Sequence, residues 1–121
     1  MAPIVRPETV ATLLGADVEQ LRTLLPMAER VARDAADLAE GDWDEIIDVT
    51  VDDDGNLLSA RCDRYSYVEL AQIRELLKVA IIYAVHWLRA HPEDEDHLSL
   101  MYTLRNLLYA IRHGPLRRNR P

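Results

Sequence analysis

The stretch from Ser66 to Ala90 constrains the fold most strongly, because it predicts one long helix with an apolar face along its whole length. Ser66 is followed three residues later by Glu69, and this pair predicts a capping box at the helix start. From residue 76 to residue 88, apolar side chains also occupy the opposite face, and only Lys78 and His86 interrupt them. A helix that is apolar on every side has to be buried on every side, by its own chain or by another.

This apolar part is too short for a membrane span, which needs about 20 such residues. We therefore expect a core helix that is enclosed on all sides, and a homodimer or an obligate protein partner that completes the enclosure. We expect His86 to be a hydrogen-bonded core histidine near that contact rather than a metal ligand. The residues expected at the contact are Val79, Ile82, Tyr83 and His86.

Residues 7–41 predict the N-terminal helices, and residues 1–6 predict a loose arm before them. Gly15 should end the first helix, since glycine readily takes the left-handed conformation of a helix end. Asp17 should cap the second helix. The apolar stripe then keeps its phase past Pro26, although proline removes one helical hydrogen bond. We expect a kink or a break there, with two nearly collinear pieces.

Residues 44–63 predict a β-hairpin, because the apolar spacing changes from the helical period to alternation at Ile47, Val49 and Val51. Residues 52–56, Asp-Asp-Asp-Gly-Asn, predict its turn. The same acidic run has the composition of a calcium loop. Arg61 stands where an EF-hand places its bidentate glutamate, so the turn is the better interpretation.

Residues 66–113 predict a helical hairpin, with His91-Pro92 ending its first helix and opening its second. The sequence Gly114-Pro115 should stop the second helix. Residues 114–121 then predict a disordered basic tail that carries Arg117, Arg118 and Arg120. Together these elements predict one α+β domain, mainly α, in which a helical bundle contains one inserted two-stranded hairpin.

One face of the last predicted helix carries polar aromatic side chains rather than charges. Tyrosine buries a large area at low entropic cost and keeps a polar tip, so a tyrosine-rich face is typical of a protein contact. The alternative is that the N-terminal helices cover this face and satisfy its hydroxyl groups. The residues of this face are Tyr102, Asn106, Tyr109 and His113.

The same helix holds Arg105 and Asn106, followed eight residues after the arginine by His113. This pattern resembles the Arg-polar…His motif of HEPN-type ribonucleases, which are small helical domains. The resemblance implies that Arg105 and His113 act on RNA at a dimer cleft. The spacing is longer here than is usual in that family, and the hairpin departs from an all-helical fold. The alternative is that both are ordinary surface side chains.

Residues 9–25 predict two short helices across a tight turn, in the manner of a helix-turn-helix. In a DNA-binding version Gln20, Arg22 and Thr23 would face the major groove. Asp17 and Glu19 would stand at the start of that helix, and few basic residues are near for phosphate contacts. We therefore favour a helical pair used for packing.

Composition limits the kinds of partner and the cellular location that we expect. The formal net charge of −7 disfavours nucleic acid as a partner, except at the basic tail, and favours basic or neutral proteins. The single cysteine, Cys62, and the absence of a signal sequence predict a reducing, cytoplasmic location. Arginine supplies thirteen of the fourteen basic side chains, which indicates a GC-rich bacterial or phage genome.

The sequence contains no pattern that predicts a metal or cofactor site, a phosphate loop or a nucleophile motif. We expect a non-enzymatic acidic binding protein that acts through protein–protein contacts, such as an adaptor, an antitoxin or immunity protein, or a phage-type inhibitor. The alternatives are the HEPN-like ribonuclease and a small helix-turn-helix DNA-binding regulator.

Overall fold

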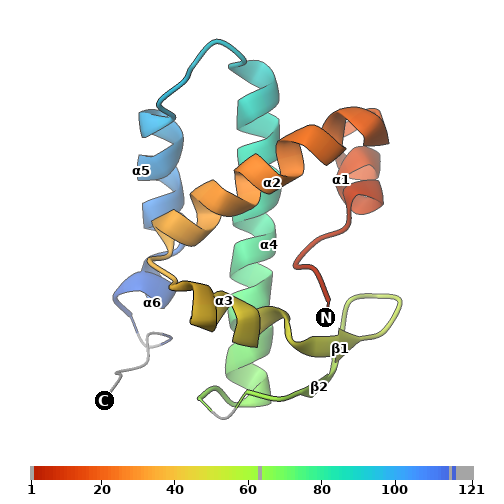
Figure 1. The fold of residues 1–121 in the computed structure, drawn as a ribbon, viewed down its shortest axis with the longest axis vertical. Coiled ribbons are helices and arrows are strands. Elements are labelled where there is room, and N and C mark those ends of the chain that lie inside the picture. Colours follow the sequence, from red (N-terminus) through yellow and green to blue (C-terminus); the bar gives the residue numbers. More distant parts are fainter. Residues whose placement is uncertain (1, 63, 115, 117–121) are drawn as a thin grey trace.

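The computed structural model describes residues 2–62, 64–114 and 116, and helix makes up 64% of it. The expected fold class is confirmed: the protein is an α+β fold, mainly α, with one two-stranded antiparallel sheet (Figure 1). Its elements in chain order are α1 (Pro7–Leu14), α2 (Val18–Ala35), α3 (Glu40–Ile47), β1 (Val49–Val51), β2 (Leu57–Ala60), α4 (Tyr67–Ala90), α5 (Leu98–Leu107) and α6 (Tyr109–Arg112).

Helix α4 is the axis of the molecule, and the other elements pack around part of its circumference (Figure 1). Helix α5 runs antiparallel beside it, α2 crosses both helices, and α3 and the hairpin lie toward its N-terminal end. The inward face of α4 forms the centre of the core. Its fully buried members include Leu70, Ile73, Leu77 and Ile81.

Three local predictions for helix ends hold. At the start of α4 the Ser66 hydroxyl accepts a hydrogen bond from the Glu69 backbone N–H (3.2 Å), and the Glu69 carboxylate accepts one from the Ser66 N–H (3.0 Å). This is the predicted capping box. Gly15 ends α1 with a φ of 61°, and the Asp17 carboxylate caps α2 by accepting from the Glu19 N–H (3.1 Å).

Helix α2 continues through Pro26, so the expected break at the proline is wrong. The side chains of Leu25 and Ala28 are buried on either side of Pro26, and their packing keeps both halves in one helix although the proline lacks its N–H. The helix ends instead at Ala35. Asp37, in the left-handed conformation with a φ of 56°, separates it from α3.

Helix α3 occupies residues 40–47, so the expected start of the hairpin at residue 44 is wrong. Trp43 and Ile46 are both buried at a helical spacing, so the helical period persists beyond the residues that suggested alternation. The hairpin is shorter than expected. Val49 pairs with Ala60 and Val51 with Leu57 in antiparallel register, with an irregularity between Thr50 and Val51.

The second helix of the predicted helical hairpin begins later than expected, at Leu98. Pro92 lies instead in a turn where the Asp94 N–H donates to the His91 carbonyl (3.2 Å). Four consecutive acidic residues, 93–96, would repel one another in a helical turn, and they stay in the connection. The helix is also interrupted at Leu108 (φ −100°, ψ 18°), which separates α5 from α6.

Both chain ends pack on the body more than the sequence suggested. The expectation of a loose N-terminal arm is wrong, because Ala2, Ile4 and Val5 are buried and the Ala2 N–H donates to the Ile47 carbonyl (2.9 Å). At the other end Leu116 is buried, so the predicted disordered tail does not begin at residue 114. Arg117, Arg118 and Arg120 lie outside the described residues.

Candidate functional site

We define the exposed flank of α4 as Glu75, Val79, Ile82, Tyr83 and His86; Ile82 is half-buried and packs against the edge of the core, whereas the other four residues are exposed. Val79 is 46% exposed and Tyr83 is 38% exposed, although both lie in the most apolar part of the chain. His86 is exposed rather than a core histidine, so that expectation is wrong. The described chain therefore does not enclose α4 on every side, and Val79 and Tyr83 are left partly open to solvent on one flank.

The face expected to carry tyrosines is also uncovered. Tyr102 is 66% exposed and Tyr109 is 60% exposed, and Asn106 and His113 are exposed beside them. The alternative, in which the N-terminal helices cover these side chains, does not occur. The interruption at Leu108 splits the face between α5 and α6. We call these four residues the tyrosine face.

Within the tyrosine face, the aromatic rings of Tyr109 and His113 lie 5.5 Å apart between centroids, and their planes are tilted by 53°. This contact lies at the end of α6. Rigid aromatic side chains lose little conformational entropy when a partner covers them. The tyrosine face can thus bury large area with two hydroxyl groups and an amide available for hydrogen bonds.

The residues of the ribonuclease resemblance lie on separate elements. Arg105 and Asn106 are exposed near the end of α5, whereas His113 follows α6 beyond the interruption at Leu108. The prediction that Asn106 and His113 share one continuous helical stripe is therefore wrong. In the described part of the chain Arg105 forms no ion pair or side-chain hydrogen bond that would hold it toward His113.

Helices α1 and α2 pack across a tight turn, with Val10 and Leu21 fully buried, but only α1 is short, since α2 extends over 18 residues. Gln20, Arg22 and Thr23 are exposed on α2. The Arg22 guanidinium forms an ion pair with Glu19 one turn earlier (3.3 Å). This pair partly neutralises the basic group that phosphate contact would require.

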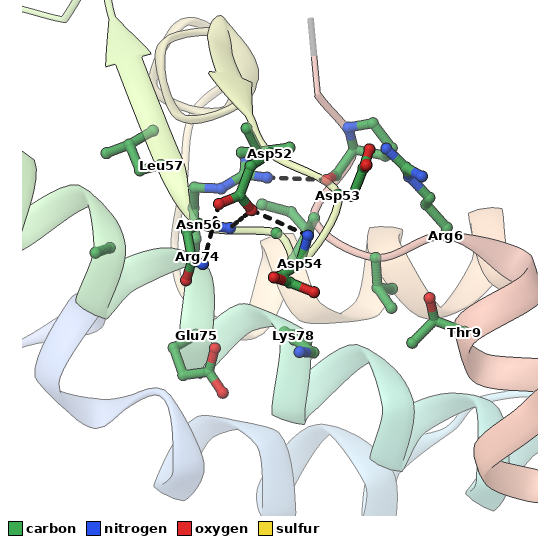
Figure 2. A pocket seen from close by; sticks show the side chains of 16 residues that line it. Arg6, Thr9, Asp52, Asp53, Asp54, Asn56, Leu57, Arg74, Glu75 and Lys78 are labelled. Atoms are coloured by element: carbon green, nitrogen blue, oxygen red, sulfur yellow. Dashed lines mark hydrogen bonds between the residues drawn. The ribbon is translucent and has the colours of Figure 1, made fainter.

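A pocket of about 260 Å³, which the sequence analysis missed, lies between the N-terminal arm, the hairpin turn and α4. Figure 2 shows Arg6 on the arm, Asp53 and Asp54 on the turn, and Glu75 and Lys78 on α4 around it. None of these five charged side chains forms an ion pair with another described residue. Charges of both signs thus face one small space.

Arg74 forms the inner wall of this pocket, and its buried side chain fastens the arm to the body. Its guanidinium donates to the carbonyl oxygens of Pro3 (2.9 Å), Ile46 (3.0 Å) and Ala2 (3.2 Å). Burial lowers the pKa of the Arg74 side chain, because the charged form loses hydration. A charged residue on the inward face of α4 was the signal in the sequence that could have revealed this contact.

The hairpin turn is closed by Asp52, as turn chemistry predicts. Its carboxylate accepts hydrogen bonds from the backbone N–H groups of Asn56 (2.8 Å) and Asp54 (3.0 Å) and from the Asn56 side-chain amide (3.1 Å). These bonds, led by the backbone bond from Asn56, hold the pKa of Asp52 below its usual range. The Asp52 carboxylate therefore stabilises the turn.

The polar lining of the pocket consists of carboxylate, amide, hydroxyl, ammonium and guanidinium groups, and no cysteine, histidine or serine is among the described residues that line it. No group of three or more His, Cys, Asp or Glu within residues 2–62, 64–114 and 116 is placed to hold a metal ion. No helix in the described ranges has both the length and the apolarity that a membrane crossing needs. The exposed flank of α4 and the tyrosine face are two further candidate surfaces beside this pocket.

Comparison with known proteins adds no family assignment: no protein-family model, curated protein or solved structure matches this chain.

Proposed function

We propose that this chain is a non-enzymatic binding protein that acts through protein–protein contacts. The single observation that carries the proposal is the tyrosine face, where Tyr102 and Tyr109 are 66% and 60% exposed on an ordered helical surface. Tyrosine is among the residues that most often supply the binding energy of protein interfaces. The proposed role is that of an adaptor, an antitoxin or immunity protein, or a phage-type inhibitor.

Charge supports a protein partner of basic or neutral character. The formal net charge of −7 repels nucleic acid and other strongly acidic partners, and it attracts a basic surface during association. Residues 93–96, Glu-Asp-Glu-Asp, add a concentrated negative charge at the connection that leads into α5. The single cysteine, Cys62, fits a reducing compartment such as the cytoplasm.

The test is affinity capture from a native lysate with the immobilised chain and two variants. Truncating an interface tyrosine commonly weakens binding by about tenfold or more, so the double variant Tyr102→Ser, Tyr109→Ser should lose the captured protein. The matched control is Leu13→Ser, since Leu13 on α1 is 61% exposed and lies outside the tyrosine face. A captured protein that all three forms retain equally, or none at all, contradicts the proposal.

A further inference from the structure

The exposed flank of α4 carries a self-complementary arrangement of side chains. Glu75, Val79, Ile82 and His86 follow one another at spacings of four, three and four residues, which places them in one stripe along the helix. The stripe is apolar in the middle, with a carboxylate at one end and an imidazole at the other. Its length along the helix axis is about 16 Å.

The two polar ends of this stripe have no partner inside the chain. Glu75 and His86 are both exposed, and neither side chain forms a hydrogen bond or ion pair with another described residue. Glu75 borders the pocket on one side of α4, as Figure 2 shows, but the charged groups around that pocket do not pair with it. Both ends are therefore available to groups outside the chain.

We propose that the occupant of this flank is a second copy of the same chain, bound with its α4 antiparallel to the first. A two-fold axis between Val79 and Ile82 sets Val79 against the partner's Ile82, and it sets Glu75 against the partner's His86. By symmetry each of these contacts forms twice, which is the arrangement of an isologous interface. Tyr83, on the edge of the stripe, packs beside the partner's Val79.

Charge complementarity is what favours a second copy over an unrelated protein. When the helix direction is reversed, the acidic end of the stripe meets the imidazole end, so the surface complements itself without any other chain. The carboxylate accepts a hydrogen bond from an imidazole N–H in either protonation state of the histidine. In a parallel arrangement, by contrast, Glu75 would face the partner's Glu75, and the two carboxylates would repel each other.

A stable dimer of standard size would cover about a tenth of this chain's surface. Such an interface removes about 800 Å² from each partner, and the chain exposes 7354 Å² in total. The inference goes beyond the proposed function, because it assigns the α4 flank to a second copy of the chain and leaves the tyrosine face for another protein.

The test reverses the charge at each end of the stripe and measures self-association by sedimentation equilibrium. Glu75→Lys places a lysine against the partner's His86, and His86→Glu places a glutamate against the partner's Glu75. Each change creates two unfavourable ends, so each variant should dimerise about tenfold or more weakly than the wild type. Far-UV circular dichroism checks that both variants keep the helical fold.

Restoration of the complementary ends makes the test specific. The double variant Glu75→Lys, His86→Glu has complementary charges again and should dimerise within about threefold of the wild type. An equimolar mixture of the two single variants should also dimerise, because a mixed pair is complementary at both ends. Val68→Glu is the control: Val68 is 67% exposed on α4, and its antiparallel counterpart falls beyond the helix end at Ala90, so association should not change.

Two outcomes overturn the inference. One is a wild type that sediments as a single chain at every concentration up to the highest soluble one. The other is a wild-type dimer that neither the double variant nor the mixture restores, which would place the contact elsewhere. A third result would exclude the second copy but leave the proposed binding function standing. In this result the wild type sediments as a monomer, and the Val79→Glu variant no longer captures a foreign protein that the wild type captures. Failure of the tyrosine variants alone would remove the proposed function and leave the dimer unaffected.

Discussion

Replacing Arg74 by methionine would show how strongly the N-terminal arm is held to the body. Methionine keeps much of the length of the apolar stem and removes only the guanidinium. Three carbonyl oxygens, those of Ala2, Pro3 and Ile46, lose their donor in this variant. We expect the arm to detach and the free energy of unfolding to fall.

The magnitude follows from those three hydrogen bonds. A hydrogen bond to a charged group contributes about 1.5–3 kcal/mol, but the cost of burying the guanidinium offsets part of the sum. The carbonyls of Ala2 and Pro3 can turn to water once the arm moves. We therefore expect a net loss of about 3 kcal/mol, equivalent to a melting temperature lower by about 10 °C for a domain of this size.

Urea unfolding followed by far-UV circular dichroism measures this loss, at one fixed protein concentration because the proposed self-association would add to stability. Arg89→Met is the matched control: Arg89 is on the same helix and makes a single long hydrogen bond to Leu14 (3.5 Å). It should cost less than about 1 kcal/mol. An Arg74→Met protein as stable as the control would refute the view that this side chain fastens the arm.

Three further predictions concern local features. Gly15→Ala should destabilise the protein by about 1 kcal/mol, because residue 15 has a φ of 61°. Gly41→Ala within α3 should instead stabilise the protein by about 0.5 kcal/mol. Thermal melts should therefore show a lower melting temperature for the first variant and a higher one for the second. Asp52→Ala should lower the melting temperature at neutral pH, because hydrogen bonds lower the pKa of Asp52 in the folded state; the difference from the wild type should shrink once the pH falls below the unfolded carboxyl pKa of about 3.9 and be lost as the pH falls through the lower folded pKa. Burial raises the pKa of Glu29, so Glu29→Gln should stabilise the protein above the unfolded glutamate pKa of about 4.3 and have little effect below it; an effect that does not depend on pH would contradict this.

The sequence predicted features that depend on a few neighbouring residues. The capping box of Ser66 and Glu69, the left-handed Gly15 and the Asp52 turn each close within five residues, and the structure contains all three. The inward face of α4 was equally clear, because its apolar stripe extends over the whole helix. Such signals do not depend on how distant segments pack.

The errors arose where tertiary packing decides between two local possibilities. Residues 46–51 fit either a helix end or a strand, and burial of Trp43 and Ile46 selects the helix up to Ile47. Packing of Leu25 and Ala28 likewise carries α2 through Pro26. The fastening of the arm by Arg74 joins residues more than seventy positions apart. An arginine on the apolar face of α4 indicates a buried contact, but no short-range pattern identifies the arm as its partner.

The candidate surfaces were partly predictable for a related reason. Tyrosines on the polar side of a helix are visible in the sequence, but whether another helix covers them depends on the fold. The structure leaves Tyr102 and Tyr109 exposed, and it exposes His86, which was expected in the core. The pocket beside the hairpin turn was missed because it forms only when the arm, the turn and α4 meet.

The central claim is that the exposed flank of α4 is covered in solution by a second copy of the chain. Light scattering coupled to size-exclusion chromatography measures this directly as a molar mass. For the wild type at micromolar concentration we predict twice the chain mass of 13.8 kDa, and for Val79→Glu we predict the mass of a single chain. A wild type that elutes at 13.8 kDa under these conditions would contradict the claim.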